Sequence, residues 1–129
     1  MSNRLFLSLH SAIYAIFAVA LFFIPALLWP MYGVEVNDRY AYFLSQHNSI
    51  FLGGIAILGV IFRDTEANSV PAQKLFRGLM WTNLLGFVIT LYACFGNIFV
   101  GFGWSDPVFF ALLAVLCFQQ LKRNNPQRG

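Results

Sequence analysis

Charged residues are scarce in this chain, and their scarcity excludes most soluble folds. Of its 129 residues, 10 % are Asp, Glu, Lys or Arg, whereas 59 % are hydrophobic. A soluble domain carries about 25 % charged residues. Every charged residue lies outside the long apolar runs or at their edges, so the composition predicts an integral membrane protein. The net charge of +3 is not accompanied by a basic stripe interleaved with aromatic residues, so we expect no nucleic-acid partner.

Cysteine is equally scarce, and its placement argues against a redox enzyme. The chain has 2 cysteines, Cys94 and Cys117, and neither belongs to a Cys-x-x-Cys motif. Cys94 lies near the outer end of the third apolar run and Cys117 near the inner end of the fourth, so more than about 10 Å should separate them along the membrane normal. A disulfide needs Cα atoms within about 7 Å of each other. We therefore expect two buried packing thiols.

The sequence also lacks the residue combinations that carry most chemistry. It has no His-x-x-x-His pair, no paired carboxylates, no Ser-His-Asp set and no phosphate-binding glycine loop. His10 should lie near the inner leaflet and His47 near the outer leaflet, so one ion cannot bind both within a protomer. His47 and Cys94 could supply two ligands at similar depth, but a third ligand is not evident. We therefore expect no catalytic residue, no metal and no cofactor.

What the chain does have is a series of long apolar runs separated by polar segments. Leu5–Leu28 contains Ala18-Val19-Ala20, which resembles a signal-peptide cleavage site. Its length of about 24 residues nevertheless exceeds the roughly 7–15 residues of a signal-peptide core, which favours a retained span. We predict an all-α fold, an integral membrane antiparallel four-helix bundle in a single domain covering residues 1–129. Its predicted segments are spans 5–28, 39–62, 75–100 and 107–121, a loop 63–74 and a disordered tail 124–129.

Several residues mark where these helices should begin, bend or end. Pro25 should bend or fray the end of the first span. Asn37 or Asp38 offers an oxygen to cap the second. Ser69, with a proline two residues later, predicts that the third helix begins at about residue 70, well before its membrane-embedded part. Asp106, followed directly by a proline, is the expected N-cap of the fourth.

The basic residues predict the orientation. Arg39 stands alone on one side, and seven other Lys and Arg residues flank the spans on the other side. Because basic residues accumulate in cytoplasmic loops, both termini and the loop between the second and third spans should be cytoplasmic. The seven are Arg4, Arg63, Lys74, Arg77, Lys122, Arg123 and Arg128.

Two of the spans carry their small residues on one face. In lipid, helices associate through close backbone approach and interhelical hydrogen bonds, so we expect these small faces to be helix-packing seams that meet each other. Bulky residues of the third span, among them Trp81, Leu84 and Phe87, should face lipid. The seam residues are Ser45, Gly53 and Ala56 in the second span and Gly78, Thr82, Gly86 and Ala93 in the third.

Polar residues gather at the expected outer ends of the second and third spans. Polar side chains inside a membrane are costly and suggest a function, although the same groups could simply bond to one another across the two seams. This polar cluster, a candidate ligand site, comprises Gln46, His47, Asn48, Ser49, Thr90, Cys94 and Asn97. His47 itself falls on the other side of its helix from the seam, which makes that side a candidate partner face formed by His47, Phe51, Gly54 and Leu58.

The order of these features resembles a known group of proteins. Phe-Phe-Ile-Pro and then Tyr-Gly stand at the end of the first span, and Gly-Gly-x-Ala-x-x-Gly precedes Arg63 in the second. Together with the short basic tail, this looks like the uncharacterised small four-span bacterial membrane proteins grouped loosely with DoxX-like proteins. The resemblance implies a location in the bacterial inner membrane. Members usually carry arginine and glycine where this chain has Ser45-Gln46-His47-Asn48, and no catalytic residue is implied.

These observations favour a non-catalytic role. We expect a self-associating protein (a homo-oligomer) or an accessory subunit of a larger membrane complex, in contact with the lipid bilayer. The alternative is a transporter or binder of a small molecule that uses the polar cluster, and a membrane-embedded enzyme is the least supported class.

Overall fold

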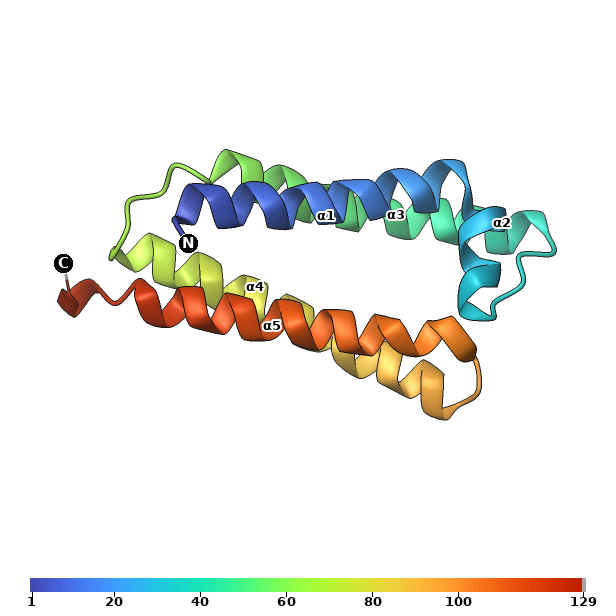
Figure 1. The fold of residues 1–129 in the computed structure, drawn as a ribbon. Coiled ribbons are helices and arrows are strands. Elements are labelled where there is room, and N and C mark those ends of the chain that lie inside the picture. The colour runs from blue at the N-terminus through green and yellow to red at the C-terminus, as the bar shows by residue number, and fades with distance from the viewer. Residues whose placement is uncertain (129) are drawn as a thin grey trace. The chain divides into compact units, whose positions relative to one another are not determined.

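The protein folds as two helical hairpins, seen in a computed structural model that describes residues 1–128. The chain divides into two compact units, Met1–Asp64 and Thr65–Gly129. Over the described residues all regular structure is helical, which confirms the all-α class. Each unit contributes two of the 4 helices that are long and apolar enough to cross a membrane. Figure 1 shows each pair lying side by side.

The first unit pairs α1 (Asn3–Phe23) with α3 (Arg39–Ile61). Between them, α2 (Pro25–Leu28) and η1 (Trp29–Tyr32) form a short helical corner. The expected break at Pro25 is confirmed, because α1 ends at Phe23 and Ile24 leaves the helical region with φ −132° and ψ 46°. At the other end of the hairpin, Arg4 and Asp64 form an exposed ion pair.

The second unit pairs α4 (Val70–Phe95) with α5 (Ser105–Arg123). The turn η2 (Gly101–Trp104) leads into α5, and η3 (Pro126–Arg128) follows it. The backbone N–H of Asn68 donates to the side-chain oxygen of buried Asn124 at 3.2 Å. This bond joins the start of α4 to the end of α5, so the two helices are antiparallel.

The predicted helix starts are confirmed in two cases and wrong in one. Asp38 accepts hydrogen bonds from the N–H groups of Tyr40 and Ala41, and Ser69 accepts from Ala72. Asp106 is not an N-cap, because α5 already begins at Ser105 and Asp106 lies in its first turn. The helix starts earlier than expected because η2 runs directly into it, with helical dihedral angles at Trp104 and Ser105.

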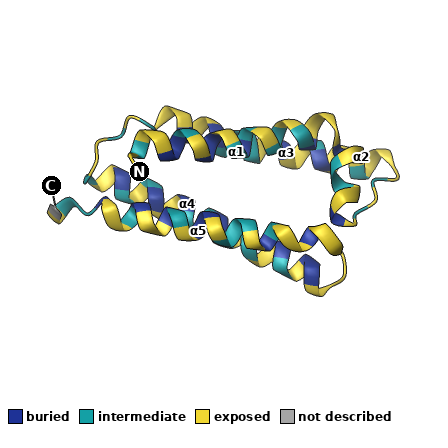
Figure 2. Ribbon diagram, in the orientation of Figure 1, coloured by how far each residue is buried: buried dark blue, intermediate teal, exposed yellow. Residues whose placement is uncertain are grey.

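Each hairpin is closed along one narrow seam. In α4, buried Ala72, Phe76, Leu79, Asn83, Thr90 and Ala93 follow one another at intervals of three, four or seven residues. When apolar residues recur every 3.5 residues on average, they form one stripe along the helix that faces a neighbouring helix. Figure 2 shows the result as buried positions that alternate with exposed ones along the long helices.

Each small seam has its partner inside its own unit. A Cβ added to Gly59 would lie 2.0 Å from the Ser11 oxygen of α1, and one added to Gly53 would lie 3.9 Å from the Ala18 Cβ. In the second unit, a Cβ added to Gly86 would lie 2.5 Å from the Phe110 ring of α5. The seams of α3 and α4 are therefore occupied by α1 and α5, which differs from the expectation that they pack against each other.

Candidate functional site

The polar start of α3 is bonded to the break between α1 and α2. Pro25 has no N–H, so the carbonyl of Leu21, four residues earlier, loses its helical donor. The Ser45 hydroxyl donates to that carbonyl at 2.8 Å and accepts from the indole N–H of Trp29, also at 2.8 Å. Buried Ser45 thus bonds to two polar groups of the corner, the Leu21 carbonyl and the Trp29 indole N–H.

Gln46 does the same for the next carbonyl of the broken helix. Its side-chain amide donates to the carbonyl of Phe22 at 3.2 Å. In a continuous helix the Phe22 carbonyl would accept from the N–H of Ala26. Because the chain departs from the helix at Ile24, that N–H is displaced from the carbonyl. Ser45 and Gln46 therefore replace the backbone bonds that α1 loses at its end.

The next residues of the candidate cluster divide between the two sides of α3. Ser49 is buried on the seam, and its hydroxyl donates to the Gln46 carbonyl at 2.5 Å. His47 and Asn48 are exposed. The His47 ring lies between two phenylalanine rings of its own helix, 5.9 Å from Phe43 and 5.6 Å from Phe51.

The candidate partner face is an exposed stripe of α3 within the first unit. Phe51 is 61 % exposed and Leu58 is 54 % exposed. Gly54 lies between them, and a Cβ added there would meet no atom within 4 Å. In this stripe the large apolar side chains of Phe51 and Leu58 flank Gly54, which has no side chain, and His47 lies at one end.

In the second unit, Thr90 and Cys94 are engaged with nearby backbone. Both residues are buried. The Thr90 hydroxyl donates to the Gly86 carbonyl one turn earlier at 2.7 Å, a common arrangement for threonine inside helices. The Cys94 sulfur lies 3.7 Å from the carbonyl oxygen of Gly103, so this thiol packs against the turn that leads to α5.

Asn97 is explained by the backbone conformation at the end of α4. It adopts φ +58°, a left-handed conformation that asparagine tolerates better than most residues. The turn lets the N–H groups of Ile98 and Phe99 reach the Ala93 carbonyl at 2.8 and 3.0 Å. These bonds close the helix end, and the exposed Asn97 therefore has a structural reason for its identity.

The candidate cluster is thus spread over the two units. Gln46, His47, Asn48 and Ser49 belong to the first unit, and the other three residues belong to the second. Of these seven residues, Gln46, Ser49, Thr90 and Cys94 direct a side-chain donor at a nearby backbone carbonyl. Of the other expected seam residues, Gly78 is exposed with no atom within 4 Å of an added Cβ, and the Thr82 hydroxyl donates to the Gly78 carbonyl.

Two buried polar residues lie deeper in the hairpins. His10 stacks with Phe6 and Tyr14, with ring centroids 5.9 and 4.7 Å away. In the second unit, buried Asn83 donates to the Leu79 carbonyl at 2.9 Å and contacts the Cys117 sulfur at 3.6 Å. Both cysteines are free and buried, as expected. Among residues 1–128, no three His, Cys, Asp or Glu side chains are close enough to hold a metal ion.

Three residues with a structural role were not identified from the sequence. Trp29 was not singled out for such a role, yet its indole N–H donates to Ser45. Ser11 was not singled out, although it fits against Gly59. Asn124 was placed in the tail, yet it is buried and binds Asn68 and the Gln120 carbonyl. The intervals of three and four residues between Leu7, Ser11 and Tyr14 could have indicated the role of Ser11.

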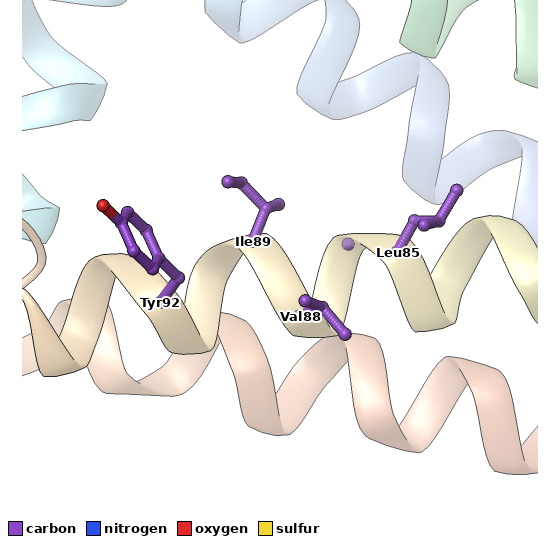
Figure 3. A pocket seen from close by; sticks show the side chains of 5 residues that line it. Leu85, Val88, Ile89 and Tyr92 are labelled. Carbon is purple, nitrogen blue, oxygen red and sulfur yellow. The ribbon is translucent and has the colours of Figure 1, made fainter.

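A shallow apolar hollow lies along α4. Its volume is about 590 Å³, and Leu85, Gly86, Val88, Ile89 and Tyr92 line it. Figure 3 shows Leu85, Ile89 and Tyr92 projecting from the same side of the helix. The tyrosine hydroxyl is the polar group among these side chains, so the hollow offers an apolar surface and little to orient a polar ligand.

Comparison with known proteins adds no further constraint: no family model, no curated protein and no solved structure matches the chain significantly.

Proposed function

We propose that the protein is a four-span integral membrane protein with a non-catalytic role, as a self-associating protein or an accessory subunit of a larger membrane complex. Its two hairpins would combine into an antiparallel four-helix bundle, with both termini on the cytoplasmic side of a bacterial inner membrane. The pattern-level resemblance to DoxX-like proteins and the one-sided basic residues support this location and orientation.

One observation carries the non-catalytic part of the proposal. The polar side chains within the apolar helices are engaged mainly in completing the fold: Ser45 and Gln46 bind carbonyls at the α1 break, and Thr90 binds its own helix. A catalytic or transport site instead needs polar groups directed at a substrate. The arrangement therefore favours a role exerted through surfaces.

The exposed surfaces suit such a role. Large hydrophobic side chains are exposed on all four long helices, for example Ile16, Phe51, Leu85 and Val108. In a bilayer these surfaces can face lipid or another membrane protein. The α3 stripe of His47, Phe51, Gly54 and Leu58 fits a protein partner best, because an imidazole facing lipid would have no acceptor and the glycine permits close approach.

Cysteine cross-linking in membranes tests this proposal. Phe51→Cys, in a background with Cys94→Ala and Cys117→Ala, should form an oxidised adduct with a second copy or with a partner subunit. Val88→Cys is the matched control, because Phe51 and Val88 are both 61 % exposed. Adducts at residue 51 and none at residue 88 support an interface on α3.

The alternative function is transport or binding of a small molecule through the polar cluster. This alternative is favoured if neither Phe51→Cys nor Val88→Cys cross-links at the natural expression level while His47→Leu abolishes binding or transport. Loss of association in His47→Leu, with the fold of the chain retained, would support the proposed interface.

A further inference from the structure

The net positive charge of the protein comes from the second unit alone. In the first unit, three basic residues are balanced by three acidic ones, and Arg4 is paired directly with Asp64. The net charge of +3 therefore arises entirely from residues 65–129. The balanced residues of the first unit are Arg4, Arg39, Arg63, Glu35, Asp38 and Asp64.

Four cations gather at one end of that unit. Lys74 and Arg77 lie in the first turns of α4, and Lys122 and Arg123 lie in the last turn of α5. The antiparallel pairing brings these ends together, and the bond between Asn68 and Asn124 at 3.2 Å fixes them. All four side chains are exposed. We refer to Lys74, Arg77, Lys122 and Arg123 as the basic end.

Aromatic rings lie directly on the apolar side of these cations. The Lys122 ammonium sits 4.9 Å from the centre of the Phe118 ring, one turn back along α5. Trp81, one turn beyond Arg77 on α4, is 59 % exposed. Exposed tryptophan is typical of the level of the lipid headgroups, so the cations stand where lipid phosphates would lie.

We propose that the basic end binds the headgroups of anionic phospholipids in the leaflet where α4 begins. Clusters of Lys and Arg beside membrane helices attract anionic lipids. Glu66 is the acidic residue nearest in sequence to this end of α4, and one carboxylate cannot neutralise four cations. The proximity of the cations to Phe118 and Trp81 favours a lipid over a soluble anion, because a lipid presents phosphate and acyl chain together. The inference rests on the membrane insertion proposed above.

The test measures lipid selectivity of the full chain in nanodiscs. The discs contain phosphatidylcholine with a minor fraction of spin-labelled phosphatidylglycerol, and the relative association of the two lipids with the protein is recorded. Lys122→Gln with Arg123→Gln should lower the preference for phosphatidylglycerol about fivefold or more, since one cation near an anionic lipid surface contributes about a fivefold effect. Arg39→Gln with Arg63→Gln removes the same charge from the first unit and should change the preference less than twofold.

The dependence of the lipid preference on salt distinguishes electrostatic binding from apolar contact. At about 1 M salt, where the screening length is about 3 Å, the preference of the unmodified protein should largely disappear. A preference that survives salt, an equal loss in both double variants, or no preference in the unmodified protein would overturn the inference while leaving membrane insertion intact. A chain that does not enter the nanodiscs would overturn the proposed membrane function as well.

Discussion

Removal of the Ser45 hydroxyl tests whether the polar start of α3 serves the fold. Ser45→Ala leaves the Leu21 carbonyl and the Trp29 indole N–H without the partner that each has at 2.8 Å. A buried polar group left unsatisfied costs about 1–3 kcal/mol. Trp29 is half-buried and can turn toward water, so the loss of its partner should cost less than the loss at the Leu21 carbonyl. We expect the free energy of unfolding to fall by about 2–3 kcal/mol for the two groups together.

Ser49→Ala is the matched control for this variant. Both serines are 4 % exposed and lie on the seam of α3. The Ser49 hydroxyl donates only to the Gln46 carbonyl of its own helix in the contacts described, so its removal should cost less than about 1 kcal/mol. Both values are measured by reversible unfolding of the full chain with sodium dodecyl sulfate in mixed micelles.

A double-mutant cycle with Pro25→Ala gives the decisive comparison. Alanine restores the N–H that can reach the Leu21 carbonyl, so the Ser45 hydroxyl should become partly redundant. We expect Ser45→Ala to cost at least about 1 kcal/mol less in the Pro25→Ala background than alone. Strict additivity, or a Ser45→Ala effect no larger than that of Ser49→Ala, would refute the argument that α3 compensates for the proline break.

Three further outcomes follow from the backbone and the seams, each measured as a free energy of unfolding. Gly86→Ala should destabilise the protein by about 1–3 kcal/mol through overpacking, because the added Cβ would lie 2.5 Å from the Phe110 ring. Gly78→Ala is the control, because its Cβ would meet no atom within 4 Å, and it should be neutral or slightly stabilising. Equal effects of the two substitutions would mean that Gly86 does not lie on the seam. Asn97→Val should cost about 1–2 kcal/mol at φ +58° and Asn97→Gly should be tolerated; equal stability of both variants would argue against the left-handed turn. Asp38→Ala should cost about 1 kcal/mol by removing the bonds to two N–H groups at the start of α3, and an unchanged stability would mean that solvent replaces the cap.

Local features of the sequence predicted much of the fold. The cap at Asp38 is an oxygen placed just before an apolar run, and the break at Pro25 follows from its missing N–H. Ser69 with Pro71 correctly indicated a start at Val70. Of the small residues expected on one face of α3, Ser45 and Ala56 are buried. These features depend on a few neighbouring residues, which the sequence displays directly.

Pairing of the helices could not be obtained in the same way. A small face fits any helix that approaches it closely, so the pattern on α3 does not distinguish α1 from α4. The choice of α1 depends on matched shapes, such as Ser11 against Gly59, and on the corner that brings Leu21 to Ser45. Asp106 was misjudged for a related reason, because the turn of Gly101–Trp104 extends the helix start through tertiary geometry.

In the candidate site, too, the sequence indicated which residues are polar and embedded but did not indicate which groups they bond to. Composition and depth were enough to gather Gln46, Ser49 and Thr90 as polar residues within apolar helices. Their hydrogen-bond partners are carbonyl oxygens, and carbonyls are present at every residue, so no sequence pattern marks which one is free. Only the position of the Pro25 break could have pointed to Leu21 and Phe22 as acceptors.

Every proposed surface depends on the membrane topology of the chain. Single cysteines at Glu35, Glu66 and Gln127, all exposed positions, are introduced with Cys94→Ala and Cys117→Ala and treated with an impermeant thiol reagent in intact cells. We expect labelling at residue 35 only, with residues 66 and 127 labelled after the membrane is permeabilised. Labelling of residue 66 or 127 in intact cells, or equal labelling at all three positions, would contradict four spans with both termini in the cytoplasm.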